Sequence, residues 1–297
     1  MKPLLFAFPG NESLCNRIAE ESGFEIGQIL LRKFPDGETY IRFQNDIRGR
    51  EIIFLCTLHL PDDKLLPLYF LSQTARDLGA TRIGLIAPYL SYMRQDKRFH
   101  EGEGITSVYF AKLISSFVDW LLTIDPHLHR RSDLNEIYSI PAQALHAAPL
   151  LAEWIKKKVE NPLLIGPDSE SEQWIEEVAR LVEAPFVVLQ KIRRGDLVVE
   201  VSVPDVQRWK DKTPVLLDDI VSTGRTMIET IKHLKSAGIQ APICMGIHAI
   251  FAGTAYQDLL KAGAAKVLTC NTIPHETNAI DVTSLLAEGL RRMSGLI

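Results

Sequence analysis

Long apolar runs are absent from this chain of 297 residues. The apolar segment near the N-terminus, residues 4–8, is cut by Pro9 and Gly10 and is too short for the hydrophobic region of a signal peptide. No stretch approaches the roughly 20 apolar residues of a membrane-spanning helix. We therefore expect neither an export signal nor a membrane span.

Cysteine is scarce as well, with four residues in the whole chain. Cys15, Cys56, Cys244 and Cys270 are widely spaced and form no CxxC pair. This spacing argues against a zinc site or a redox motif and is typical of reduced thiols. We expect a cytoplasmic protein.

An excess of charge of one sign is also missing. The 33 basic and 37 acidic residues give a net charge of −4, so neither general nucleic-acid binding nor binding to a membrane surface is expected. A polyanionic ligand must then be bound by a local cluster. The chain has no GxxxxGK[ST] segment, which excludes an ordinary P-loop.

The apolar residues that are present predict an α/β protein. Short apolar runs at residues 51–55, 82–87 and 162–165 alternate with helical patterns, as in parallel sheets covered by helices. The strand, loop, helix and strand of residues 52–86 are echoed at residues 215–247, which indicates duplicated halves. We place a first domain at residues 1–147 and a second at 148–297, and we allow the last helix, roughly residues 282–293, to pack on the first half.

The most informative segment is residues 215–227, VLLDDIVSTGRTM. It predicts a buried strand, a loop rich in hydroxyl groups, and a helix that runs to Gly238. Backbone N–H groups at that helix N-terminus, with the Ser and Thr hydroxyls, would bind a phosphate. Asp218 and Asp219 would accept hydrogen bonds from sugar hydroxyls or hold a divalent metal. An acidic strand end followed by an ordinary helix cap is the alternative.

Three other segments allow a functional and a plain structural interpretation. Residues 34–38, FPDGE, place an aromatic ring and two acids on a turn, which is also typical of a simple hairpin. Residues 94–98, RQDKR, gather three cations that suit a triphosphate, but a solvated loop has the same composition. His127 follows an apolar strand, where α/β sheets bind ligands, although a histidine there is often structural.

These motifs carry a family resemblance. Residues 217–226, LDDIVSTGRT, resemble the phosphoribosyl-diphosphate signature of type I phosphoribosyltransferases and ribose-phosphate diphosphokinases. Residues 34–40 and 92–98 resemble two further segments that only the diphosphokinases share, and the similarity runs over almost the full length. Residues 102–104, GEG, look closer to the archaeal-type subgroup. The resemblance implies two stacked type I phosphoribosyltransferase-like domains, with parallel sheets flanked by helices.

The resemblance also implies a reaction and a set of site residues. The family transfers the diphosphoryl group of ATP to the 1-hydroxyl of ribose 5-phosphate and releases AMP. By this resemblance, the expected ATP-binding residues are Phe34, Asp36, Glu38, Arg94, Gln95 and His127. The expected ribose 5-phosphate-binding residues are Asp218, Asp219, Ser222, Thr223, Gly224, Arg225 and Thr226.

Catalysis and the metal follow from the same resemblance. Lys191 and Arg193 are expected on a lid that closes over the transferring group. The cofactor is Mg²⁺, with His127 and Asp168 as its residues, and we expect His127 to act on ATP phosphate or through a water ligand of the metal. In the family, the loop around Phe34 reaches a neighbouring subunit, which implies a homo-oligomer, from dimer to hexamer.

The chain departs from the common family pattern at three places. Residues 169–171, SES, replace a glycine pair, Ser222 replaces an acid, and Arg225 replaces a glycine. Three alternative functions therefore stay open. They are a non-catalytic regulatory relative, a phosphoribosyltransferase, and a kinase of a related phosphorylated pentose.

Overall fold

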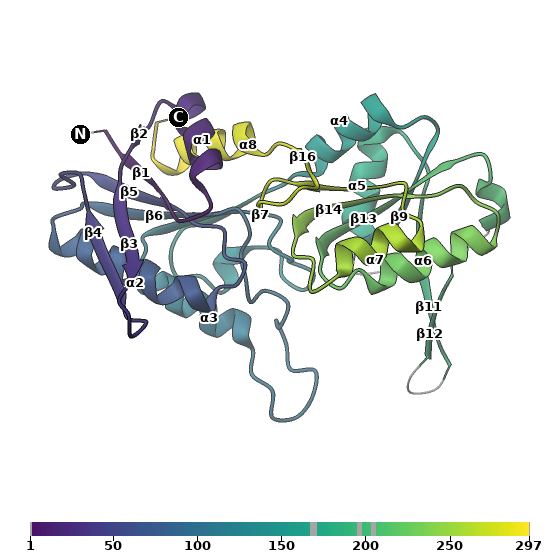
Figure 1. The fold of residues 1–297 in the computed structure, drawn as a ribbon, viewed down its shortest axis with the longest axis horizontal. Helices are drawn as coiled ribbons and strands as arrows, with labels where there is room; N and C mark the ends of the chain where they lie inside the picture. Colours follow the sequence, from purple (N-terminus) through teal and green to yellow (C-terminus); the bar gives the residue numbers. More distant parts are fainter. Residues whose placement is uncertain (1, 167–170, 195–197, 203–205, 297) are drawn as a thin grey trace. The chain divides into compact units, whose positions relative to one another are not determined.

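The computed structural model describes residues 2–166, 171–194, 198–202 and 206–296, and it omits the side chains of residues 173 and 190–207. The chain divides into two compact units, Met1–Leu145 with Thr283–Ile297, and His146–Val282. The fold is mixed α/β, as the sequence predicts (Figure 1). Within the described ranges, no helix is both long and apolar enough to cross a membrane.

The first unit contains one parallel sheet, one hairpin and four α-helices in its described residues. Its elements are β1 (Leu4–Ala7), α1 (Glu12–Ser22), β2 (Glu25–Ile26), β3 (Ile29–Lys33), β4 (Thr39–Phe43), β5 (Glu51–Leu55), α2 (Asp62–Asp77), β6 (Arg82–Ala87), α3 (Thr106–Ser115), β7 (Trp120–Ile124), η1 (Leu134–Glu136), β8 (Ala142–Leu145) and α8 (Thr283–Met293). The strand order of the sheet is β2-β1-β5-β6-β7-β8, with all neighbours parallel. β3 and β4 form a separate antiparallel hairpin.

Chain direction decides which face of this sheet each helix covers. The connection β1-α1-β2 runs toward one edge, whereas β5-α2-β6-α3-β7 runs toward the other. Because such crossovers are right-handed, α1 lies on the opposite face from α2 and α3. The C-terminal helix α8 packs beside α1 and against β7 and β8 (Figure 1). Helices therefore cover both faces, which explains why β5, β6 and β7 are almost wholly buried and apolar.

Tight packing in the first unit depends on a small residue beside a large one. Trp120 on β7 is fully buried. A Cβ atom at Gly84 on the adjacent β6 would lie 2.1 Å from the Trp120 ring, so any larger residue would displace the indole. The indole Nε1 donates to the Glu51 carboxylate at 2.9 Å, and Arg82 pairs with the same carboxylate at 3.2 Å.

The second unit repeats this plan. Its elements are α4 (Ala148–Lys158), β9 (Pro162–Gly166), α5 (Glu172–Val182), β10 (Phe186–Val188), β11 (Gln190–Arg194), β12 (Val198–Ser202), η3 (Val206–Trp209), β13 (Thr213–Val221), α6 (Arg225–Ser236), β14 (Ile243–Ala249), α7 (Ala255–Ala262), β15 (Lys266–Cys270) and β16 (Asn278–Ile280). The order β10-β9-β13-β14-β15-β16 is again all parallel, and β11 and β12 form a hairpin.

Corresponding elements confirm the duplication that the sequence predicts. The hairpin β3–β4 precedes β5 in the first unit, and β11–β12 precedes β13 in the second. β5 and β13 hold the same place in their sheets, as do β6 and β14. The helix that follows the last strand of each sheet belongs to the other unit, since α4 packs against α5 and β16, whereas α8 packs against α1.

Candidate active site

The two neighbouring carboxylates lie on the central strand of the second unit. The sequence pattern ends the strand at Asp218 and Asp219, but β13 continues to Val221 because Ile220 and Val221 still pair with β14. Successive side chains of a strand point to opposite faces. Asp218 lines a small hollow at this strand end, and Asp219 is not among its lining residues. The Asp219 carboxylate instead accepts the Ile220 N–H at 2.8 Å.

The hydroxyl loop connects β13 to the N-terminus of α6. Gly224 caps the helix with a φ of 65°, a left-handed conformation that favours glycine. No side chain caps the helix and its first turn holds no acid, so first-turn N–H groups and the helix dipole are available to an anion. The hollow of about 100 Å³ is lined by Asp218, Ile220, Val221, Ser222, Thr223, Gly224, Arg225, Thr226 and Met227.

The connection between β14 and α7 supports this loop through backbone hydrogen bonds. The N–H groups of Phe251 and Ala252 donate to the carbonyls of Val221 and Ser222 at 2.9 and 3.0 Å. The Phe251 ring packs on His275 with centroids 4.6 Å apart. Sequence reasoning missed this support, because residues 251 and 275 are far from the motif along the chain.

In the first unit, the hairpin β3–β4 presents Phe34, Asp36 and Glu38 at its exposed tip. The Phe34 N–H donates to the Glu38 carbonyl at 2.8 Å, and the Asp36 carboxylate accepts the Glu38 N–H at 3.1 Å. Phe34 is 40% exposed. The Arg32 guanidinium lies 4.7 Å from the centre of the Phe34 ring and 4.4 Å from that of Tyr40. The tip therefore offers an oriented aromatic ring.

The cationic loop of residues 88–105 joins β6 to α3. Arg94 is exposed, whereas Gln95 is half-buried. The Thr106 hydroxyl donates to the side-chain oxygen of Gln95 at 3.0 Å, and the Ser107 N–H donates to the Gln95 carbonyl at 3.3 Å. These bonds tie the RQDKR segment to the first turn of α3.

Glu103, within the GEG segment that looks closer to the archaeal-type subgroup, holds the same loop in a turn. Its carboxylate accepts the N–H groups of His100 and Phe99 at 3.0 and 2.7 Å. Both bonds lower the pKa of Glu103, and the bond from His100 has the larger effect. The Arg98 guanidinium donates to the Glu103 carbonyl at 3.0 Å. Residues 102–104 thus shape a compact turn.

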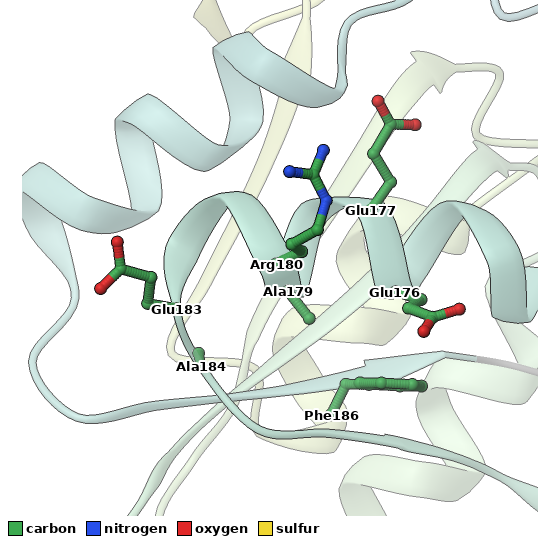
Figure 2. Close-up of a pocket in the computed structure, with 7 residues that line it drawn as sticks. All are labelled: Glu176, Glu177, Ala179, Arg180, Glu183, Ala184 and Phe186. Atoms are coloured by element: carbon green, nitrogen blue, oxygen red, sulfur yellow. The ribbon is translucent and has the colours of Figure 1, made fainter.

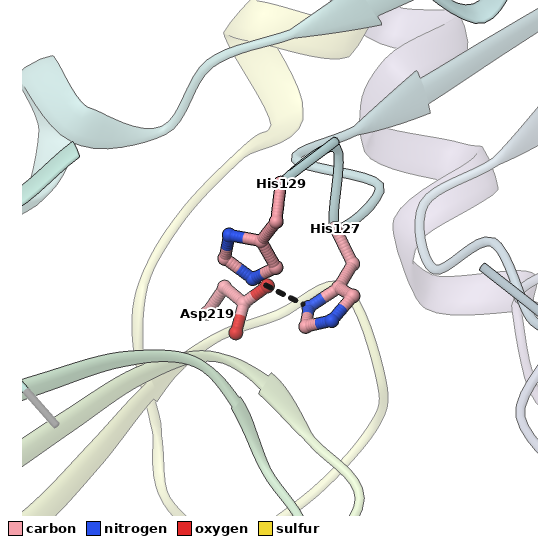
Figure 3. A group of neighbouring side chains, drawn as sticks. All are labelled: His127, His129 and Asp219. Carbon is pink, nitrogen blue, oxygen red and sulfur yellow. Dashed lines mark hydrogen bonds between the residues drawn. The ribbon is translucent and has the colours of Figure 1, made fainter. Parts of the chain in front are cut away.

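His127 lies just after β7, beside His129, which the sequence analysis does not include among the site residues. Asp125 and His127 have φ values of 35° and 57°, and this bent backbone brings the His129 ring against that of His127. His129 Nε2 and His127 Nδ1 share a hydrogen bond of 3.0 Å, with the rings nearly perpendicular (Figure 3). The His-x-His spacing is the signal that could have identified His129.

Three expected residues cannot be placed by their side chains. Asp168 lies outside the described residues. Lys191 and Arg193 belong to β11, whose backbone pairs with β12, but their side chains lie outside the described part of the chain.

A second hollow in the same unit has a different chemistry. It has a volume of about 640 Å³ and lies along α5 and β10 (Figure 2). Among the described residues, its charged lining comprises Glu176, Glu177 and Glu183 with one guanidinium, that of Arg180. This excess of carboxylates disfavours a phosphate, whereas the hollow at the β13–α6 loop offers hydroxyls, helix N–H groups and Arg225.

The repeated sheet order and the Asp-Asp-hydroxyl loop define a protein built of two phosphoribosyltransferase-like domains. Two family models agree: the N-terminal domain of ribose phosphate pyrophosphokinase matches residues 4–117, and the phosphoribosyl transferase domain matches residues 133–285. The chain belongs to the ribose-phosphate pyrophosphokinase family.

Similar proteins span nearly the whole chain. Ribose-phosphate pyrophosphokinase of Methanobrevibacter smithii is 29% identical over 293 residues, covering 95% of this chain and 97% of that protein. The enzyme of the same name from Sulfolobus acidocaldarius is 32% identical over 265 residues, covering 87% and 89%. The crystal structure of phosphoribosylpyrophosphate synthetase from Mycobacterium smegmatis matches with a TM-score of 0.88 at 26% identity and covers 100% of both chains. The archaeal relatives agree with the subgroup expected from the GEG segment.

Proposed function

We propose that this chain transfers the β,γ-diphosphoryl group of ATP to the 1-hydroxyl of ribose 5-phosphate. The products are phosphoribosyl diphosphate and AMP. The hollow at the β13–α6 loop carries the proposal together with family membership, because it combines a carboxylate with an acid-free helix N-terminus. A sugar phosphate needs both features.

Ribose 5-phosphate binds at the β13–α6 loop in this proposal. Ser222, Thr223 and Thr226 supply hydroxyl donors, and Gly224 lets the backbone approach the 5-phosphate. Arg225 is exposed and lines the hollow, where its guanidinium adds a charged contact. Asp218, which lines the hollow, accepts hydrogen bonds from the ribose hydroxyls.

ATP binds to residues of the first unit. Phe34 stacks on the adenine, with Asp36 and Glu38 at its polar edge. Arg94 and Gln95 bind the phosphates, and His127 contacts them beside His129. The exposed Phe34 ring and the tied-down Gln95 support this assignment.

The chemistry depends on alignment and charge neutralisation. The 1-hydroxyl oxygen attacks the β-phosphorus and loses its proton, while the bond from that phosphorus to the α,β-bridging oxygen breaks and AMP leaves. Lys191 and Arg193 stabilise the negative charge on the phosphoryl oxygens from the β11–β12 hairpin. Phosphoryl transfer leaves the protein little covalent work.

The donor groups suit Mg²⁺, which prefers oxygen ligands. Asp218 offers a half-buried carboxylate at the hollow, and Asp168 is a second carboxylate of the same unit. The metal would be held by Asp168, and it would neutralise charge on the phosphates. His127 Nδ1 shares a hydrogen bond with His129 Nε2, which orients the His127 ring.

We also propose that the protein works as a cytoplasmic homo-oligomer. Its four cysteines are buried free thiols, in keeping with a reducing compartment. The exposed aromatic tip of β3–β4 suits a loop that completes the site of a neighbouring subunit.

Phosphorus NMR tests the reaction directly. Purified protein with ATP, magnesium and ribose 5-phosphate should give AMP together with the diphosphate signals of phosphoribosyl diphosphate. Formation of ADP instead would indicate a simple pentose-phosphate kinase. Binding of either substrate without any product would favour the regulatory alternative.

A further inference from the structure

Asp96 is a buried acid within an otherwise exposed cationic segment. Its neighbours Arg94, Lys97 and Arg98 are exposed, but only 4% of the Asp96 side chain is accessible. A buried carboxylate needs a charged or hydrogen-bonding partner. The partner of Asp96 comes from a different loop.

That partner is Arg130, which lies 34 residues further along the chain. Its Nη1 atom is 3.1 and 3.2 Å from the two carboxylate oxygens of Asp96. The Arg130 guanidinium also lies 5.6 Å from the centre of the Phe99 ring, and Lys97 lies 5.1 Å from that same ring. Arg130 therefore binds the cationic loop through both an ion pair and an aromatic contact.

Arg130 and Asp96 each lie next to an expected nucleotide-binding loop. Arg130 follows His129 directly, on the connection between β7 and β8. Asp96 follows Gln95, whose side chain and carbonyl are bonded to Thr106 and Ser107. The pair thus fastens the loop of Arg94 and Gln95 to the loop of His127.

We propose that Arg130 and Asp96 are positioning residues for the nucleotide phosphates, which rests on the proposed function. Neither residue needs to touch ATP. The ion pair holds the two loops of the first unit in one arrangement, so that Arg94, Gln95 and His127 reach the phosphates together. Loss of one partner leaves a buried charge and loosens both loops.

Steady-state kinetics of Arg130→Met and Asp96→Asn test the proposal. The KM for ATP should rise about tenfold or more in each variant, whereas the KM for ribose 5-phosphate should stay within about twofold. Arg130→Lys should recover part of the loss. The double variant should be no worse than Arg130→Met, because both substitutions remove the same interaction.

Arg76→Met is the matched control. Arg76 pairs with Asp119 at 3.0 Å in the same unit, and both side chains are more than one-third exposed. This variant should leave the KM for ATP unchanged. A rise equal to that of Arg130→Met, or an equal rise in both KM values of the Arg130 variants, would overturn the positioning role.

Calorimetric binding of α,β-methylene ATP, whose scissile bridge is blocked, separates this proposal from the proposed reaction. If the wild-type protein binds the analogue but forms no AMP from ATP, the proposed reaction fails while weaker binding by Arg130→Lys and Arg130→Met still supports the positioning role. If these variants bind the analogue as tightly as the wild type, the positioning role is wrong. Lack of binding by the wild type overturns both.

Discussion

The loop after β13 in the second unit and the loop after β5 in the first occupy the same place in two sheets of the same order. The β13–α6 loop has glycine at the cap, no acid in the first helical turn, and a hollow lined by hydroxyls. The β5–α2 loop has Pro61 at the cap and Asp62 and Asp63 in the first turn. Two carboxylates neutralise the positive end of the helix dipole and repel an anion, so of these two loops the β13–α6 loop is the one that suits a phosphate.

The loop in the first unit is filled by its own side chains instead. Lys64 Nζ donates to the Thr57 carbonyl at 2.8 Å and lies 3.1 Å from His59 Nδ1. Burial first, and then the charge of Lys64, lower the pKa of His59 to about 4. The position at which we propose that ribose 5-phosphate binds in the second unit is thus a structural turn in the first.

Cations follow the opposite distribution in the next pair of loops. The first unit has RQDKR between β6 and α3, whereas residues 250–254 between β14 and α7 contain no charged group. The second unit uses that connection to support the β13–α6 loop through Phe251. This difference between two loops of the same topology agrees with our proposal that the first unit binds the nucleotide and the second the sugar phosphate.

The largest predicted effect comes from the comparison of the hairpins β3–β4 and β11–β12. Lys191 lies on β11, which corresponds to β3 of the first unit. Lys191→Ala should lower turnover by about 100-fold or more, since it removes a cation that acts on the transition state, and should leave ribose 5-phosphate affinity nearly unchanged. Turnover and calorimetric affinity measured on the same preparation check this. An equal loss in both would exclude the lid role.

The strands and the duplicated order could be predicted because each is encoded in a local apolar pattern. The full length of β13 could not, since its last residues are held by pairing with β14. The contact of His129 with His127 depends on positive φ values at Asp125 and His127, which cannot be predicted from the residue types. The pairing of Asp96 with Arg130 is a contact between distant loops and has no local signature.

Placing two acids at the start of α6, as at the start of α2, tests the comparison of the β5–α2 and β13–α6 loops. The double variant Arg225→Asp, Thr226→Asp gives α6 the same first two residues as α2. Ribose 5-phosphate affinity should fall by about 100-fold, because two carboxylates then face the phosphate and a guanidinium is lost. The melting temperature should hold or rise slightly, since acids stabilise a helix N-terminus.

For the double variant we therefore expect calorimetry to show a lower affinity for ribose 5-phosphate, and thermal melting to show an unchanged or slightly higher melting temperature. The matched control is Lys232→Asp, which places an acid at an exposed position later in α6. It should leave the affinity unchanged. Retention of ribose 5-phosphate binding in the double variant would show that the phosphate binds elsewhere.

The pH dependence of stability should come from the first unit's loop. The pKa of His59 falls from 6.5 to about 4 on folding, so the unfolded chain binds the proton first as the pH drops. Stability conferred by the neutral imidazole is complete above pH 6.5 and is lost as the pH falls toward 4, by about 2 kcal/mol for this half-buried group. His59→Asn keeps an acceptor for Lys64 but does not titrate.

Urea unfolding at pH 7.5 and pH 5 measures how much the free energy of unfolding of the wild type and of His59→Asn changes with pH. The wild type should lose more stability than His59→Asn over this interval. Residues 222–226 of the second unit contain no group that titrates in this range, so the corresponding loop adds nothing to the difference. Identical losses in the two proteins would contradict the assignment to His59.

The smallest predicted effect concerns the aromatic tip of β3–β4, which has no counterpart in the LysIleArg pattern of β11. Arg32 lies over both Phe34 and Tyr40, and each contact of this kind contributes about 0.5–1 kcal/mol at an exposed site. Arg32→Met should therefore free the Phe34 ring and raise the KM for ATP about threefold to tenfold, with turnover retained. Arg42→Met, on the same hairpin, is the control, because Arg42 is an exposed arginine of β4. If both variants raise the KM equally, the charge of the hairpin matters rather than the orientation of Phe34, and the two hairpins would then differ less in mechanism than their sequences indicate.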